Sequence, residues 1–208
     1  MTNENNSADG HVYVDLGLPS GTLWAECNVG ASKPEDRGDY FAWGETQAKK
    51  PGESYYWESY KYATDKRDEL TQYCGRPDHG YESHTDKLTI LLPEDDAATA
   101  NWGNGWCMPT AEQWEELMNN TTKKWMTQEG VKGCLFSASN GKSIFLPMGG
   151  LRSKCDFVKD GVEGYYWSRS LNSDYPNFAF GFYFNIAKTY VYIFSRYYGF
   201  LVRPVLKK

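Results

Sequence analysis

The sequence predicts an α+β fold with two central helices and mostly antiparallel sheets. Residues 94–102 and 111–118, in the middle of the chain, carry helix start signals. Residues 11–28 and 134–205 instead show short apolar or alternating segments separated by turn residues, as strands do. Strands at both ends of a chain around a pair of helices are typical of an α+β domain.

The first ten residues predict a disordered leader, and residues 11–208 predict a single domain. After the initiating methionine, residues 1–10 contain no large apolar side chain. Residues 11–16 alternate polar and apolar side chains and predict an edge strand, and residues 18–21 predict a turn. Residues 22–28 predict a second strand, so the domain is expected to open with a hairpin.

The next hundred residues predict loops and then a first helix. Residues 40–44 indicate a short buried strand or turn, and residues 65–89 are polar and indicate a long loop. Residues 94–102 follow Pro93 and carry three acidic residues in their first turn, where the helix dipole favours negative charge. We therefore expect one helix over this range.

The second helix is predicted over residues 111–118. Thr110 is suited to cap its N-terminus, and Gln113 stands three residues later, as the partner in a capping box does. Helical spacing then places three apolar residues on one buried face: Trp114, Leu117 and Met118.

Strands are predicted to dominate the rest of the chain. Residues 123–133 form a polar segment without a clear period. A hairpin is expected next, because residues 134–139 and 143–146 are largely apolar and flank an Asn-Gly turn. Another strand is expected to start at 165–168, and three more are expected over residues 178–185, 189–194 and 199–205.

Composition argues against several classes of partner. The 208 residues carry a formal net charge of −5 and no cluster of Lys and Arg, so a nucleic-acid partner is not expected. No apolar run reaches the ~20 residues that a spanning helix needs, so direct membrane insertion is not expected. The five cysteines include no CxxC pair, which argues against a zinc site.

The sequence contains little that supports catalysis, so we expect no catalytic residues, no metal and no cofactor. All three histidines lie within the first 84 residues, and no Gly-x-Ser-x-Gly motif is present. The acidic residues 94–96 are more typical of a helix start than of a calcium site. We therefore predict that the protein is not an enzyme.

Residues 165–201 form the block most suggestive of function, since 15 of these 37 residues are Tyr, Phe or Trp. Within it, residues 190–194 alternate aromatic and aliphatic side chains, and successive side chains of a strand point to opposite faces. One face is then expected to expose aromatic rings, which is typical of a binding surface. A sheet buried on both faces remains the alternative.

Several motifs resemble a large group of proteins from gut Bacteroidales. They include residues 14–25 (VDLGLPSGTLWA), 38–45 (GDYFAWGE), 106–110 (WCMPT) and 202–205 (VRPV), and the resemblance covers residues 12–205. The group has a C-type-lectin-like fold related to the formylglycine-generating, sulfatase-modifying proteins. Many members resemble the variable proteins of diversity-generating retroelements in bacteria and their phages.

The resemblance implies that residues 165–205 form a variable region. In those systems a reverse transcriptase misreads template adenines, and the copies replace the 3′ end of the gene. Asn codons can then become Tyr, Phe, Ser, Gly, Ile, Leu or Asp codons. The implied ligand-binding positions are Tyr175, Phe178, Phe180, Gly181, Tyr183, Ile186, Tyr190, Tyr192, Ile193, Phe194, Ser195, Tyr198, Phe200 and Leu201.

The implied function is that of a ligand-binding display protein on a bacterial cell surface or phage particle, with a protein or glycan of a target cell as its partner. Two departures bear on this. Cys107 stands where the group usually has Arg, and no cysteine follows Cys155, so the cysteine pair of the sulfatase-modifying enzymes has no counterpart. A fixed surface lectin or adhesin and a sulfatase-modifying-type enzyme remain the alternatives.

Overall fold

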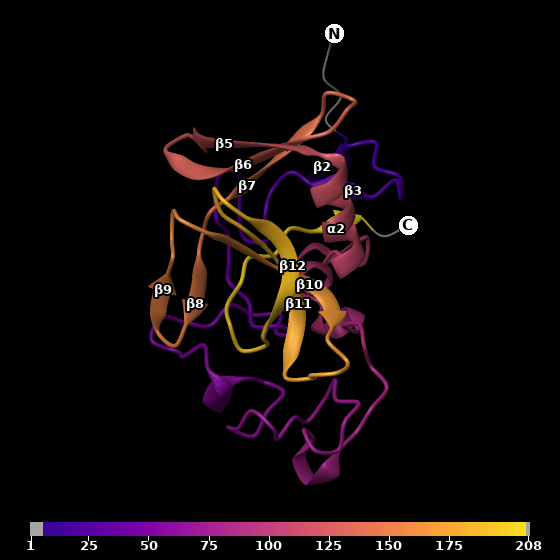
Figure 1. The fold of residues 1–208 in the computed structure, drawn as a ribbon, viewed down its shortest axis with the longest axis vertical. Helices are drawn as coiled ribbons and strands as arrows, with labels where there is room; N and C mark the ends of the chain where they lie inside the picture. Colours follow the sequence, from indigo (N-terminus) through magenta and orange to yellow (C-terminus); the bar gives the residue numbers. More distant parts are fainter. Residues whose placement is uncertain (1–5, 207–208) are drawn as a thin grey trace.

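The computed structural model describes residues 6–206 and confirms an α+β fold with antiparallel sheets (Figure 1). Within these residues, one five-stranded sheet, two three-stranded sheets and one two-stranded sheet accompany two α-helices. Short 3-10 turns η1 (Trp57–Ser59) and η2 (Tyr81–Ser83) lie in the long loops between residues 26 and 92.

The five-stranded sheet joins both ends of the described chain in the order β1-β2-β3-β13-β4. Its strands are β1 (Ser7–Ala8), β2 (His11–Asp15), β3 (Leu23–Ala25), β4 (Trp106–Cys107) and β13 (Val205–Leu206). The predicted opening hairpin is confirmed as β2–β3. The prediction of a disordered leader is wrong for β1, which pairs with β2; residues 1–5 lie outside the described part of the chain.

The first predicted helix is divided in two at Asp96. A 3-10 turn, η3 (Pro93–Asp95), precedes α1 (Ala97–Trp102), and Asp96 between them has the extended dihedrals φ −91° and ψ 113°. The Asp96 carboxylate accepts hydrogen bonds from the Thr99 and Met108 backbone N–H groups, both at 3.0 Å. Asp96 therefore caps α1 and ties it to the strand β4 segment, which a continuous helix would not allow.

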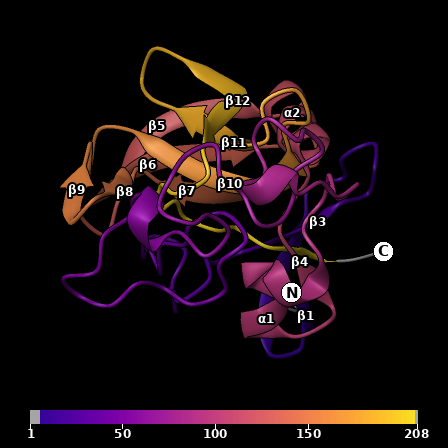
Figure 2. The ribbon, with the colours of Figure 1, turned by 90° about the horizontal axis from the view of Figure 1, so that it is seen from below.

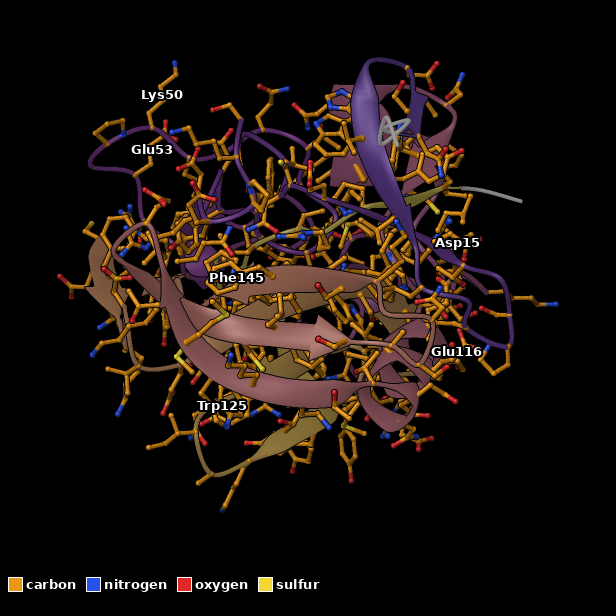
Figure 3. All side chains as sticks on the ribbon, turned by 90° about the horizontal axis from the view of Figure 1, so that it is seen from above. Asp15, Lys50, Glu53, Glu116, Trp125 and Phe145 are labelled. Carbon is orange, nitrogen blue, oxygen red and sulfur yellow. The ribbon has the colours of Figure 1, made fainter. Side chains whose placement is uncertain are left out.

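The second helix, α2 (Ala111–Asn120), has the predicted capping box. Thr110 accepts from the Gln113 backbone N–H, and the Gln113 side chain accepts from the Thr110 N–H. In the middle of the helix, the Glu116 carboxylate accepts from Ser20 in the turn before β3. Figure 3 shows Glu116 on the same side of the molecule as Asp15 of β2. The helix is thus fastened to the opening hairpin.

The polar segment 123–133 is largely strand. It contributes most of β5 (Thr122–Gln128), which pairs with β6 (Val131–Ser137), and β6 pairs with β7 (Ser143–Pro147) as the predicted Asn-Gly hairpin. Figure 3 looks onto this sheet and labels Trp125 and Phe145. A small hairpin of β8 (Leu151–Ser153) and β9 (Asp156–Val158) follows.

The last three-stranded sheet has the order β10 (Gly164–Leu171), β11 (Phe178–Phe184) and β12 (Thr189–Ser195). Helix α2 covers one face, where Trp114 stacks on Phe182 with ring centroids 4.6 Å apart. The predicted strand 199–205 is mostly irregular: Phe200 and Leu201 form single bridges to Phe41 and Tyr166, and only β13 is regular strand.

Candidate functional site

The β10-β11-β12 sheet presents different residues on its two faces. The inner face, toward α2, carries Phe182 and Phe184, both fully buried. The outer face carries the opposite set, because side chains alternate along each strand. The register pairs Tyr183 with Tyr190 and Gly181 with Tyr192 on that outer face.

The outer-face rings of β11 and β12 form a continuous series, which we call the aromatic row. Tyr183 stacks on Tyr190 with centroids 4.6 Å apart, and Tyr190 meets Tyr192 at 6.0 Å. Tyr192 then contacts Phe194 at 6.1 Å, and Phe194 contacts Phe200 at 5.1 Å. The row therefore runs from an exposed strand into the core, and its buried end holds the exposed end in place.

Tyr192 and Tyr190 are the exposed members of the row, with 59% and 37% of their surface accessible. Two other implied ligand-binding residues are also exposed: Ile186, in the β11–β12 turn, at 76%, and Tyr175, before β11, at 53%. The structure leaves six more partly accessible: Phe178, Phe180, Ile193, Phe194, Ser195 and Tyr198. Side chains alternate along each strand, so Phe194 shares the outer face with Tyr190 and Tyr192. The strand residues on the opposite face are Phe178, Phe180, Ile193 and Ser195.

Four implied ligand-binding residues are buried, so direct ligand contact at these positions stays a prediction that their burial does not favour. Phe200 and Leu201 have no accessible surface, Tyr183 is 7% accessible, and Gly181 is buried. Phe200 stacks on Trp167 with centroids 4.1 Å apart. Phe200 also contacts the rings of Tyr165, Phe194 and Tyr198, so it supports the accessible surface from beneath.

Gly181 is required by close packing. A Cβ atom at this position would lie 3.0 Å from the Tyr166 carbonyl oxygen, 3.1 Å from Phe194 and 3.4 Å from Phe200. The row's two phenylalanines occupy the space that a side chain would take. Variation at Gly181 would therefore disturb the row itself and not simply change one contact.

Arg196, directly after β12, anchors the same region and is fully buried. Its guanidinium donates to the Tyr60 hydroxyl and to the backbone carbonyls of Tyr73, Pro176 and Gln72. Four aromatic rings surround it, with the Trp43 ring centroid 4.8 Å away. The sequence contains no signal for this arrangement, which we call the Arg196 cage, because the four aromatic residues lie more than a hundred residues earlier.

Tyr183 and Tyr190 remain neutral hydrogen-bonding groups over the ordinary pH range. Burial and the nearby Glu163 carboxylate raise the pKa of Tyr183 to about 12, and the same causes raise the pKa of Tyr190. Strand β12 itself carries no charged side chain. The row therefore offers apolar rings and hydroxyl groups in place of charge, which suits protein and sugar surfaces alike.

A second aromatic cluster, missed by the sequence analysis, continues from the row. Tyr198 contacts Tyr197 at 4.5 Å, and Tyr197 contacts Tyr56 at 4.9 Å. Lys154 lies over the Tyr56 ring at 5.5 Å, so positive charge borders this end. Tyr56 lies in a loop without periodicity, and no sequence pattern connected it to the C-terminal block.

The side chains considered for catalysis do not converge. His11 stacks on Trp102 at 3.7 Å, whereas His79 contacts Asp68 at 2.8 Å in the loop. Within residues 6–206, no group of three or more His, Cys, Asp and Glu side chains could hold a metal ion.

Arg169 bears on the unusual Cys107. The Arg169 Nε lies 3.8 Å from the buried Asp96 carboxylate, and its Nη2 donates to the Leu91 carbonyl oxygen at 2.7 Å. Positive charge therefore reaches Asp96 from β10, although residue 107 is a buried cysteine. Arg169 therefore places a positive charge near Asp96 without an arginine at position 107.

Comparison with known proteins gives no relative: no family model, no curated protein and no solved structure matches the chain. In the described part of the chain, no helix is long and apolar enough to cross a membrane.

Proposed function

We propose that this chain is a non-enzymatic binding protein with a C-type-lectin-like fold, which recognises a protein or glycan on a target cell through its aromatic row. The observation that carries the proposal is the pair Tyr190 and Tyr192, exposed side by side on a strand whose buried neighbours fix their positions. The α+β arrangement with antiparallel sheets is compatible with the fold that the sequence resemblance implies.

The physical argument is preorganisation. Tyr190 is stacked on Tyr183, and β12 is paired along its whole length with β11, which α2 supports from behind. Side chains already ordered in the free protein lose little conformational entropy on binding. Tyrosine rings add large contact area with few rotatable bonds, as they do in antibody binding loops.

The second part of the proposal is diversification by a retroelement, with display on a bacterial cell surface or a phage particle. Burial divides the implied variable positions into two sets. The exposed Tyr175, Ile186, Tyr190 and Tyr192 accept almost any side chain, since little packs against their outer atoms. Phe200 and Leu201 do not, because a polar replacement would be buried.

Sequencing the DNA around the gene tests diversification directly. We expect a near-copy of the codons for residues 165–205 close to a reverse transcriptase gene, with the template carrying adenines at the codons of Tyr190 and Tyr192. Template adenines should be absent from the codons of Gly181, Phe200 and Leu201. A genome with no such repeat would exclude diversification and leave a fixed binding protein.

Binding is tested separately on arrays of host and bacterial glycans and on intact gut bacteria, with the fluorescently labelled chain. We expect specific signals that Tyr190→Ser and Tyr192→Asn remove, while Tyr81→Ser, which changes an exposed tyrosine of the η2 turn, leaves them unchanged. Signals that survive both row substitutions would place the binding site elsewhere.

A fixed lectin or adhesin is favoured by one observation. Gly181, Phe194 and Phe200 fit one another so closely that the row is partly an ordinary packed core. Sequences of this gene from several isolates discriminate the two proposals. Identical codons at Tyr190 and Tyr192 in all isolates would favour the fixed protein.

A further inference from the structure

The outer edge of β12 has no pairing partner in the described chain. In its sheet, β12 pairs with β11 alone and stands last in the order β10-β11-β12. Figure 2 shows β12 on the outside of the sheet and β10 toward the middle of the molecule. The opposite edge is different: bridges from Ile90, Leu201 and Gly150 to β10 cover it. The sheet therefore has one covered edge and one open edge.

The hairpin bond identifies which backbone groups of β12 face outward. The Asn185 N–H donates to the Lys188 carbonyl oxygen, so these two residues close the β11–β12 turn. Hydrogen-bonded and non-bonded pairs alternate along an antiparallel ladder, and the register here is continuous from Phe184–Thr189 to Phe178–Ser195. Val191 and Ile193 therefore direct their N–H and C=O groups away from β11, toward the open edge.

The sequence of β12 lacks the devices that normally protect an open edge. Residues 189–195 read TYVYIFS, with no charge, no proline and no glycine. Natural edge strands are usually interrupted by lysine, proline or a bulge, because unpaired backbone groups beside apolar side chains attract another strand. Strand β12 is regular and seven residues long, and Tyr192 at its centre is 59% accessible.

The same seven residues are complementary to themselves in the antiparallel direction. With a two-fold axis at Tyr192, Thr189 lies opposite Ser195, Tyr190 opposite Phe194 and Val191 opposite Ile193. Each hydroxyl, aromatic and β-branched residue meets one of its own kind, which is favourable for cross-strand pairs. This register also pairs the outward Val191 and Ile193 as hydrogen-bonded partners at the centre of the strand.

From these observations we infer that two copies of this chain associate through β12, forming a symmetric dimer with a continuous six-stranded sheet. The inference rests on the open edge and its sequence and does not depend on the proposed function. The covered edge at β10 prevents further addition, so the assembly closes at two copies. An axis perpendicular to the sheet keeps both aromatic rows on one side, where they join into a single surface across Tyr192.

The test is the mass of the full chain in solution, measured by sedimentation equilibrium from about 1 µM to about 200 µM. We expect the wild-type chain to approach twice the monomer mass of 23.8 kDa as concentration rises. Tyr192→Lys places two like charges beside the axis and should weaken association at least about tenfold. The matched control Tyr81→Lys makes the same exchange at an exposed tyrosine of η2 and should leave the wild-type association unchanged.

A charge-swap experiment distinguishes edge pairing from damage to the fold. Tyr192→Lys and Tyr192→Glu should each be monomeric alone and should associate when mixed, because opposite charges then meet at the axis. A wild-type chain that stays monomeric over the whole range would overturn the inference. So would a Tyr192→Lys variant that dimerises like wild type, or a mixture that fails to associate although both variants are folded by circular dichroism.

Discussion

Arg196 donates its Nε to the Tyr60 hydroxyl at 2.7 Å, and this bond joins the end of β12 to a loop 136 residues earlier. Three backbone carbonyls accept the remaining guanidinium bonds, and the charge stands among aromatic rings with no carboxylate bonded to it. The Asp95 carboxylate accepts hydrogen bonds from the hydroxyl groups of Tyr62 and Tyr73. The rings of these two tyrosines also surround Arg196.

Arg196→Met should therefore be one of the most destabilising substitutions on the chain. It leaves buried acceptors unsatisfied, and we expect a loss of at least ~3 kcal/mol in the free energy of unfolding. Arg76→Met removes an arginine from a surface ion pair with Asp78 and should cost at most ~1 kcal/mol. Chemical denaturation of both variants makes the comparison; equal losses would contradict the role assigned to the cage.

Protonation of Asp95 should lower the free energy of unfolding at acidic pH. Burial opposes ionisation of its carboxyl group, but hydrogen bonds from Tyr62, Tyr73 and Lys61 outweigh this and lower its pKa. A lowered folded-state pKa stabilises the fold above the unfolded value near 4, and this contribution is lost as pH falls toward the folded value. Asp95→Asn should lower stability at neutral pH by ~1–3 kcal/mol and flatten the acid dependence. Denaturation at about pH 7, 5 and 3 tests both effects, with the exposed Asp156→Asn as control.

Gly181→Ala should destabilise the fold although alanine is the smallest possible addition. The new methyl group meets the Tyr166 carbonyl and the rings of Phe194 and Phe200, so a loss of ~1–3 kcal/mol is expected. Gly75→Ala is a suitable control, because a Cβ there lies 3.8 Å from its nearest neighbour. Thermal unfolding that fails to distinguish the two variants would show that the row relaxes freely.

Tyr192 and Phe200, two members of the same row, should respond in opposite ways to the same change. Tyr192→Asn should alter the free energy of unfolding by less than ~0.5 kcal/mol, since the side chain is mostly exposed. Phe200→Asn should cost ~3–5 kcal/mol, because it removes a fully buried ring and buries an amide. Tyr190→Ser should fall between them at ~1 kcal/mol, reflecting its stack on Tyr183. A large loss at Tyr192 would mean that the exposed end of the row is structural.

Alkaline titration should occur in two steps. Burial raises the pKa of Tyr55 to about 12, and it also raises the pKa values of Tyr60 and Tyr166. A raised pKa in an acidic group leaves stability intact below the unfolded value near 10 and removes it as pH rises further. Tyrosinate absorbance should therefore show a late increase that coincides with loss of circular dichroism. A single step without unfolding would contradict the burial of these rings.

Local signals predicted the elements best. The capping box at Thr110 and Gln113 and the Asn-Gly hairpin are short-range features, and both are present. The break in the first helix at Asp96 was not predicted. It depends on the hydrogen bond from the Met108 N–H, which comes from outside the helix and overrides the local preference for one continuous helix. The strands in segment 123–133 were not predicted for a different reason. Strand β5 lies at the edge of its sheet and shows only a weak apolar period.

The location of the candidate surface could be predicted from the sequence, but the burial of its individual residues could not. Alternation along β12 placed Tyr190 and Tyr192 on one face, as the structure has them. Nothing in the sequence showed that Leu201 pairs with Tyr166 at the β10 edge, or that Phe200 stacks on Trp167 in the core. Likewise, Tyr56 joins the surface through its contact with Tyr197, which lies in a distant loop. Such contacts produce no periodic pattern in the sequence.

The position of β13 between β3 and β4 has a consequence for how the molecule is made. Val205 pairs with both Trp24 and Cys107, so this sheet closes only when strands far apart in the sequence come together. Such long-range closure is slow and all-or-none in character. A chain cut short anywhere in the aromatic block would leave β3 and β4 without their common neighbour. A copy that lacks β13 is therefore expected neither to close this sheet nor to present Tyr190 and Tyr192 in order.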